Sequence, residues 1–176
     1  MFYKDDRLAI FIDGTNLYSA AKALDLELDY KLLRQEFIRR GALVRLSYHI
    51  ALLENDEPSV LRPLVDWLSY NGYSVVSKTA REYVDTSGYR KVKANVTTDI
   101  AVAAMEIAPH VSHIVLMSGD GDLVALVEAL KRKGVRVSIV STVYSKPSTI
   151  SDELRRVADY FIDLEQLKPI ISKPPR

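Results

Sequence analysis

Short apolar runs alternate with segments of helical periodicity along most of the chain, and this alternation constrains the fold more than any other feature. Runs typical of buried strands lie at 7–13, 43–53, 73–79, 113–118, 135–142 and 160–163. Helices are predicted between them at 16–24, 30–40, 58–72, 97–108, 123–134 and 151–158. Strands separated by helices form a parallel sheet that is covered on both faces. The predicted fold class is α/β, a three-layer sandwich with a mainly parallel central sheet.

The length of 176 residues suits one domain. We assign residues 1–168 to this domain and interpret the Pro-rich segment 169–176 as a loose C-terminal tail. Within the domain, the segment between the third apolar run and the fourth predicted helix is expected to form a hairpin with its turn at 85–88.

The composition excludes several classes of function. The chain has no cysteine, so disulfides, zinc–thiolate sites and thiol nucleophiles are excluded. No apolar run approaches the roughly 18 residues that a membrane span needs, and the first residues have no apolar signal core. We therefore expect a cytoplasmic protein with no membrane partner. The net charge is only +1, from 24 basic and 23 acidic residues, so any nucleic-acid contact must use a local patch.

Acidic residues follow two of the apolar runs, where each predicted strand ends. Asp13 ends the first run, in FIDGTN, and Asp120 and Asp122 follow the fourth run, in MSGDGDL. Because ligands of open parallel sheets bind beyond the carboxyl ends of the strands, these three carboxylates are expected to converge there. Asp99, in the first turn of a predicted helix, could supply a fourth. Crowded carboxylates repel one another, and oxygen ligands without histidine or cysteine suit Mg²⁺ or Mn²⁺.

Each acid also has a simpler interpretation. An aspartate after a strand often caps a helix or forms a turn, which would account for Asp13 alone. Gly119 and Gly121 permit unusual backbone angles, so the segment around Asp120 could be a turn. Taken alone, Asp99 is more often a first-turn charge than a ligand.

A different chemistry is suggested by two short stretches, IDGT and GDGD. They are similar to motifs of the haloacid-dehalogenase phosphatases, whose D-x-D-G-T begins with an aspartate nucleophile. Here Phe11 occupies the nucleophile position, and Asp122 comes too early for the second acid of the later motif. This alternative would require Asp13 to act as the nucleophile.

Four longer stretches together resemble the bacterial LabA-like NYN domain, which belongs to the PIN-like nucleases. They are LAIFIDGTNLY, KANVTTDIAVAAMEIA, IVLMSGDGDLVALVEALKRKGVRVSIVS and LRRVADYFIDL, in the family's order and over nearly the whole chain. The resemblance implies a PIN-like, Rossmann-like topology and a metal-dependent ribonuclease site. Carried over residue by residue, it makes Asp13, Asp120 and Asp122 the acids of the metal site, with Asn16 beside Asp13.

One stretch departs from the family pattern. The resemblance implies two aspartates in KANVTTDIAVAAM at positions where this chain has Thr97 and Ala103, while Asp99 occupies the intervening acidic position. Threonine is a neutral and weaker ligand than aspartate, and alanine is none. We therefore expect fewer acids in the site and a lower affinity for the second of two ions, unless Asp99 substitutes.

The predicted hairpin before that helix is rich in basic and aromatic residues. Lysines and arginines can neutralise phosphates, and tyrosines can stack on unpaired bases. The same residues could equally form a solvated surface, but the family resemblance favours a groove for single-stranded RNA. The residues concerned are Lys78, Arg81, Tyr83, Tyr89, Arg90, Lys91 and Lys93.

The leading hypothesis is a Mg²⁺- or Mn²⁺-dependent ribonuclease that cleaves single-stranded RNA, with Asp13, Asp99, Asp120 and Asp122 as catalytic metal ligands. The residues expected to orient the ligands or the phosphate are Thr15, Asn16 and Ser118. An RNA- or protein-binding module with a depleted site is the main alternative, and the phosphatase is the third. The RNA target and a homodimeric state are left open.

Overall fold

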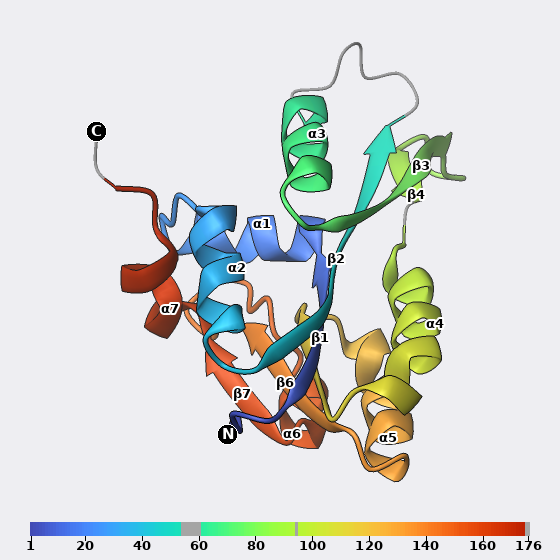
Figure 1. Cartoon of the computed structure of the whole chain (residues 1–176). Helices are drawn as coiled ribbons and strands as arrows, with labels where there is room; N and C mark the ends of the chain where they lie inside the picture. Colours follow the sequence, from blue (N-terminus) through green and yellow to red (C-terminus); the bar gives the residue numbers. More distant parts are fainter. Residues whose placement is uncertain (54–60, 94, 175–176) are drawn as a thin grey trace.

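A seven-stranded sheet with the strand order β4-β3-β2-β1-β5-β6-β7 forms the middle layer of the protein (Figure 1). The structure, a computed structural model, describes residues 1–53, 61–93 and 95–174. Neighbouring strands run parallel, except that β3 and β4 form an antiparallel hairpin. The strands are β1 (Arg7–Asp13), β2 (Ala42–Leu53), β3 (Ser74–Val84), β4 (Arg90–Lys93), β5 (His113–Met117), β6 (Arg136–Ser141) and β7 (Tyr160–Asp163).

Helices cover both faces of this sheet (Figure 1). One hydrophobic core joins the sheet to α1, α2, α3 and α7, and a second core joins the opposite face to α4, α5 and α6. The helices are α1 (Gly14–Ala23), α2 (Tyr30–Ile38), α3 (Arg62–Tyr70), α4 (Thr97–Ile107), α5 (Val124–Arg132), α6 (Asp152–Val157) and α7 (Leu164–Ile171). The predicted α/β class and three-layer arrangement are confirmed.

Strand β1 lies at the centre of both cores. Successive side chains of a strand point to opposite faces, so Ile10 and Ile12 enter one core while Ala9 and Phe11 enter the other. All four are buried. An unbroken apolar run in the sequence is therefore explained by a strand that is covered on both sides.

The C-terminal segment differs from the loose tail that its prolines suggested. Helix α7 continues through Pro169 to Ile171, and Leu164, Leu167 and Ile171 are buried in the first core at helical spacing. Proline removes one backbone hydrogen bond from this short helix. Burial of these three side chains outweighs that loss, and the Asp29 N–H donates to the carbonyl of Ile171 at 2.8 Å.

Other helix and strand boundaries differ from the predicted ones by a few residues. Strand β3 extends to Val84, beyond the expected end at residue 79, because β4 pairs with its second half. Helix α3 begins at Arg62 with Pro63 in its first turn, where a missing N–H costs nothing. Residues 58–60, which the prediction placed in this helix, lie outside the described residues.

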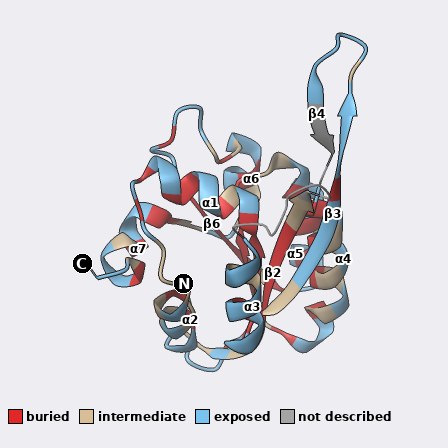
Figure 2. Cartoon of the chain, turned by 90° about the horizontal axis from the view of Figure 1, so that it is seen from above, coloured by how far each residue is buried: buried red, intermediate tan, exposed pale blue. Residues whose placement is uncertain are grey.

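The expected hairpin is present, and it projects from the body of the molecule (Figure 2). Its turn is closed by the Asp85 N–H, which donates to the Tyr89 carbonyl at 2.9 Å, and by the Gly88 N–H, which donates to the Asp85 carbonyl at 3.0 Å. Gly88 has φ +82°, a conformation that favours glycine. In the described ranges, no helix is long and apolar enough to cross a bilayer.

Candidate active site

The order in which the chain adds strands to the sheet reverses between β1 and β5. From β1 the chain adds β2 and β3 on one side, then crosses over to place β5 on the other side of β1. Open α/β sheets bind ligands in the crevice beyond the carboxyl ends of the two strands that flank such a reversal. Asp13 ends β1, and Asp120 follows β5 by three residues. Both residues line a cavity of about 360 Å³ at this point.

Asp13 is fixed by the start of the helix that follows it. Its Oδ1 accepts a hydrogen bond from the N–H of Asn16 at 3.1 Å, so it is the N-cap of α1. Its Oδ2 accepts from the Ser118 hydroxyl at 3.5 Å. Burial raises the pKa of Asp13 above its ordinary value, and the charge of Asp120 acts in the same direction. The simpler interpretation as a cap is therefore correct, and the carboxylate lines the cavity as well.

Asp120 is held from three directions. Its Oδ2 accepts a hydrogen bond from the Thr97 hydroxyl at 2.8 Å, and its Oδ1 accepts from the backbone N–H of Asp122 at 2.9 Å. Its own N–H donates to the Ser118 hydroxyl at 3.2 Å. Ser118 therefore contacts both cavity acids and fixes their relative positions.

The loop after β5 needs a glycine at position 119. A Cβ on Gly119 would lie 1.7 Å from the carbonyl oxygen of Thr149, so no side chain fits. The Gly119 N–H donates to the side-chain oxygen of Asn16 at 2.9 Å, which joins this loop to α1. Asn16 thus connects the two segments that carry the acids.

The other two predicted acids lie elsewhere. Asp122 is exposed, and Asp99 binds the Lys78 ammonium at 3.0 Å. Neither is among the described residues that line the cavity. In the described part of the chain, no group of three or more histidine, cysteine, aspartate or glutamate residues is placed to hold a metal ion. The structure brings together Asp13 and Asp120, and the assignment of all four as ligands stays a prediction.

The two positions that depart from the family pattern have different environments. Thr97 is buried and lines the cavity, where its hydroxyl binds Asp120. Ala103 lines a separate cavity of about 370 Å³ with Phe11 and Glu106. Thr97 therefore belongs to the candidate site, whereas Ala103 lies away from it.

The sequence interpretation missed four cavity residues, Ser19, Ala51, Asn95 and Val96. Ser19 lies four residues after Thr15 on α1, so helical spacing could have indicated it. The Asn95 side chain accepts from the Thr97 N–H at 2.7 Å, an arrangement typical of asparagine just before a helix. Ala51 and Val96 carry no such signal, because small apolar residues are common on any buried surface.

The cavity offers oxygen donors of the kind that hard cations prefer. Mg²⁺ is commonly held by one or two carboxylates, with water and substrate phosphates completing the shell. Asp13 and Asp120 supply two carboxylates, and Thr15, Asn16 and Thr97 add neutral oxygens around them. The electrostatic repulsion between the two acids would be relieved by a bound cation. The residues present therefore fit Mg²⁺ or Mn²⁺.

His49 lies next to Asp13 in the register of β1 and β2. It is 1% exposed, and within the described ranges neither ring nitrogen has a hydrogen-bond partner. Burial lowers the pKa of His49, although the charge of Asp99 opposes this. His49 is therefore a neutral, buried residue beside Asp13 in the sheet.

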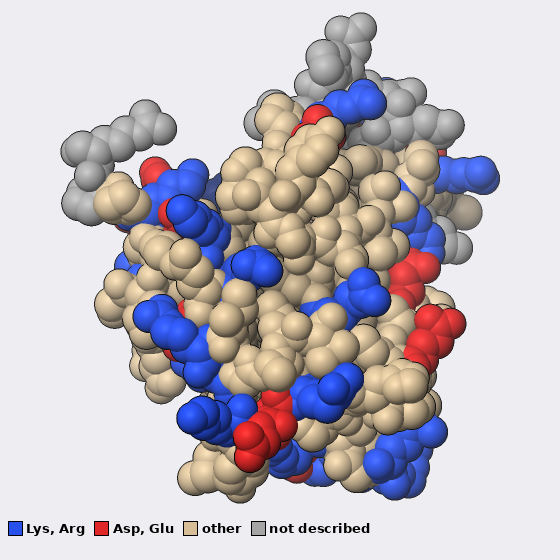
Figure 3. All heavy atoms as spheres, viewed as in Figure 1, with Lys and Arg blue, Asp and Glu red and all other residues tan. Residues whose placement is uncertain are grey.

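The basic hairpin is exposed but its charges are not all free. Arg90, Tyr83 and Tyr89 are exposed, while the Lys78 ammonium is bound to Asp99. The side chains of Lys91 and Lys93 lie outside the described residues. Figure 3 shows Lys and Arg spread over the visible face, without one dominant patch.

The fold and its acid pair define an α/β domain with a carboxylate-lined cavity at the switch point of its sheet. The model of the NYN domain family matches residues 7–165. A relative in Synechococcus elongatus, the low amplitude and bright protein LabA, is 31% identical over 180 residues, with 100% of this chain and 93% of the relative covered. The chain therefore belongs to the NYN domain family.

A solved structure is also similar. It is a protein of unknown function from Vibrio parahaemolyticus, with a TM-score of 0.74, 25% identity, and 93% of this chain and 96% of that chain covered. The predicted PIN-like topology is confirmed. NYN domains are PIN-like nuclease domains, so membership supports an RNA-related nuclease or binding function at the level of the family.

Proposed function

We propose that the protein is a Mg²⁺- or Mn²⁺-dependent ribonuclease that cleaves phosphodiester bonds in single-stranded RNA. The observation that carries the proposal is the convergence of Asp13 and Asp120 on one cavity at the switch point of the sheet. Membership of the NYN domain family supports the same function.

The ion would be held by Asp13 and Asp120. When bound, it would activate water and stabilise the charge that develops on the scissile phosphate. Ser118 and Thr97 hold the two carboxylates through the hydrogen bonds described above. Such outer contacts fix ligand orientation and strongly influence metal affinity.

The side chains of α1 would position the phosphate. Thr15 and Asn16 lie in the first turn of this helix and line the cavity. The positive end of the helix dipole favours an anion at this place. The exposed hairpin, with Arg90 and the neighbouring Lys91 and Lys93, would contact the RNA backbone on the side of β3 and β4.

A cleavage assay tests this proposal directly. We expect cleavage of single-stranded RNA with Mn²⁺, loss of cleavage in excess EDTA, and no release of phosphate from a small phosphomonoester. The proposal would be contradicted if RNA stays intact at saturating Mn²⁺ while circular dichroism shows that the protein is folded.

An RNA-binding module with a depleted site is the second candidate. It is favoured by Thr97, which occupies a cavity position where the resemblance implies an aspartate. It is also favoured by the small number of acids, because among the described residues only Asp13 and Asp120 line the cavity and no larger metal-binding cluster is present. Tight RNA binding without turnover would support this candidate over the first.

The phosphatase alternative has the weakest support. Its support was confined to two short motifs, whereas the NYN model matches residues 7–165.

A further inference from the structure

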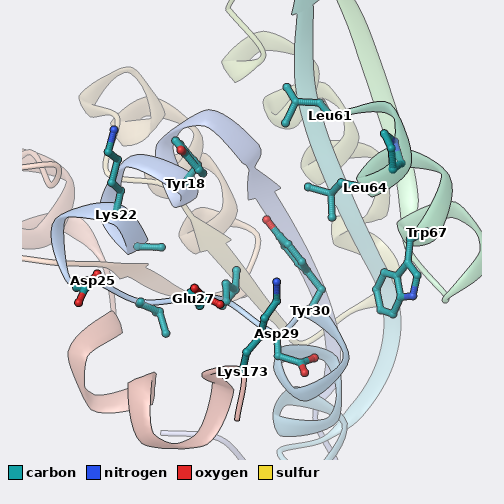
Figure 4. Close-up of a pocket in the computed structure, with 14 residues that line it drawn as sticks. Tyr18, Lys22, Asp25, Glu27, Asp29, Tyr30, Leu61, Leu64, Trp67 and Lys173 are labelled. Atoms are coloured by element: carbon teal, nitrogen blue, oxygen red, sulfur yellow. The ribbon is translucent and has the colours of Figure 1, made fainter. Parts of the chain in front are cut away.

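A second and larger cavity lies on the other side of α1. Its volume is about 800 Å³, within the range of small-ligand sites. Figure 4 shows Tyr18 and Lys22 of α1 on one side, Leu64 and Trp67 of α3 on the other, and Tyr30 between them. Tyr18 is 63% exposed and Trp67 is 38% exposed, so two aromatic side chains are open to a ligand.

This aromatic pocket and the acid-lined cavity share one helix as a wall. Thr15, Asn16 and Ser19 line the acid-lined cavity, and Tyr18 and Lys22 line the aromatic pocket. Consecutive side chains of a helix point about 100° apart, so Tyr18 and Ser19 face the two cavities from adjoining sides of α1. A strand whose phosphate lies at Asp13 and Asp120 could cross α1 and place another of its bases in the aromatic pocket.

We propose that the aromatic pocket is a nucleobase subsite, which receives an unstacked base of the same RNA strand that the acid-lined cavity cleaves. This inference rests on the proposed function. Proteins that bind single strands commonly stack bases on aromatic side chains, since every base has a π-face. The aromatic side chains of Tyr18 and Trp67 supply such surfaces from opposite sides of the pocket.

The charged groups of the pocket give it a base preference. Asp25 and Glu27 line it, are exposed, and have no ion pair within the part of the chain that the structure describes. Carboxylates accept hydrogen bonds from the N4 amino group of cytosine, which has two N–H donors, whereas uracil has the O4 carbonyl in its place and donates only through its single N3–H. The ammonium groups of Lys22 and Lys173 can neutralise the adjoining phosphates. The pocket therefore favours cytosine over uracil.

The protein carries its own probe of this pocket, because Trp67 is its only tryptophan. Oligo(C) and oligo(U) of about eight nucleotides, within the length range of single-strand sites, are titrated in EDTA so that the strand stays intact. Trp67 fluorescence reports the pocket, and the anisotropy of a labelled copy of each oligomer reports total binding. Tyr18→Ala is compared with Tyr70→Ala, which removes an 88% exposed tyrosine of α3 that does not line the pocket.

We expect Trp67 fluorescence and anisotropy to saturate at the same RNA concentration, with tighter binding of oligo(C) than of oligo(U). Tyr18→Ala should weaken binding by about 10-fold, and Tyr70→Ala should leave it unchanged. Equal binding of oligo(C) and oligo(U) would overturn the base preference. A rise in anisotropy with constant Trp67 fluorescence and wild-type binding by Tyr18→Ala would overturn the subsite and leave the proposed function standing.

Two further outcomes separate failure of the RNA proposal from binding of a free nucleotide. If anisotropy rises neither in EDTA nor with Mn²⁺ added to the cleavage-deficient Asp120→Asn variant, the RNA proposal itself fails. If CMP alone changes Trp67 fluorescence and does not compete with oligo(C), the pocket binds a free nucleotide, and its placement on the path of the strand is wrong. Competition between CMP and oligo(C) supports the subsite.

Discussion

The hydroxyl of Thr97 donates a hydrogen bond to Asp120 Oδ2 at 2.8 Å, which joins the first residue of α4 to the loop after β5. At position 97 the family resemblance implies an aspartate. This chain has a threonine there, whose neutral hydroxyl orients the carboxylate of Asp120. The site keeps a carboxylate pair, Asp13 and Asp120, with the threonine beside it.

The effect of a third carboxylate is the first prediction. Thr97→Asp should let Mn²⁺ bind more tightly, so cleavage should saturate at a lower Mn²⁺ concentration. Without metal, the protein should lose about 1–2 kcal/mol of stability, because a hydrogen bond is lost and three acids repel. Thermal unfolding with and without Mn²⁺ measures both effects. Thr98→Asp, at an exposed neighbouring position, is the control. A fall in activity in folded Thr97→Asp protein would mean that the threonine itself is required.

The ion pair of Asp99 gives the second prediction. Asp99 and Lys78 are both partly exposed, and such pairs contribute less than about 1 kcal/mol. Asp99→Asn should therefore change stability little and should leave the Mn²⁺ dependence of cleavage unchanged. A large rise in the Mn²⁺ concentration needed for half-maximal cleavage would show that Asp99 leaves Lys78 to bind the ion.

The hairpin gives the third prediction. Replacing Arg90, Lys91 and Lys93 by alanine should weaken RNA binding and lower the magnitude of its salt slope by about 2, if each cation contacts one phosphate of a single strand. The matched control replaces Lys31, Arg132 and Lys133, which are exposed on other elements. Equal salt slopes for the two triple variants would make the hairpin an ordinary solvated surface.

A buried histidine at the start of β5 gives the fourth prediction. Burial, aided by the charge of Arg136, lowers the pKa of His113 to about 4. The unfolded chain therefore binds a proton near pH 6.5 that the native state does not accept until about pH 4. Stability should fall as the pH is lowered through this window, by about 3 kcal/mol in total.

Urea unfolding between pH 7 and pH 4 measures this loss. His113→Gln should flatten the dependence on pH, while His110→Gln, which changes an exposed histidine, should leave it as in the wild type. An unchanged slope in His113→Gln would place the pH dependence in other groups.

The convergence of Asp13 and Asp120 was predictable from sequence, because it follows from two parallel strands ending at one edge of a sheet. The positions of the other acids depended on tertiary contacts. Asp99 meets Lys78 only because β3 lies beside β2 and extends far enough to reach α4. Asp122 follows Asp120 by two residues, and the 3₁₀ turn at Gly121–Leu123 leaves it exposed.

Helix α7 is a second feature that could not be predicted from local sequence. Pro169 is a strong signal for the end of a helix, and local propensity alone predicts an irregular segment. Burial of Leu167 and Ile171 against the first core reverses that preference. Tertiary packing of this kind has no local signature in the chain.

Asp120 allows the most direct test of the central claim, that an acid pair holds a divalent ion for RNA cleavage. Mn²⁺-dependent cleavage of single-stranded RNA is measured for the wild type and for Asp120→Asn, which keeps the shape of the side chain and removes its charge. We predict more than about 100-fold loss of cleavage, at or beyond what loss of an outer-shell partner costs. The metal-free variant should be at least as stable as the wild type, because its repulsion with Asp13 is gone. Cleavage by Asp120→Asn at the wild-type rate, with the same Mn²⁺ dependence, would contradict the claim.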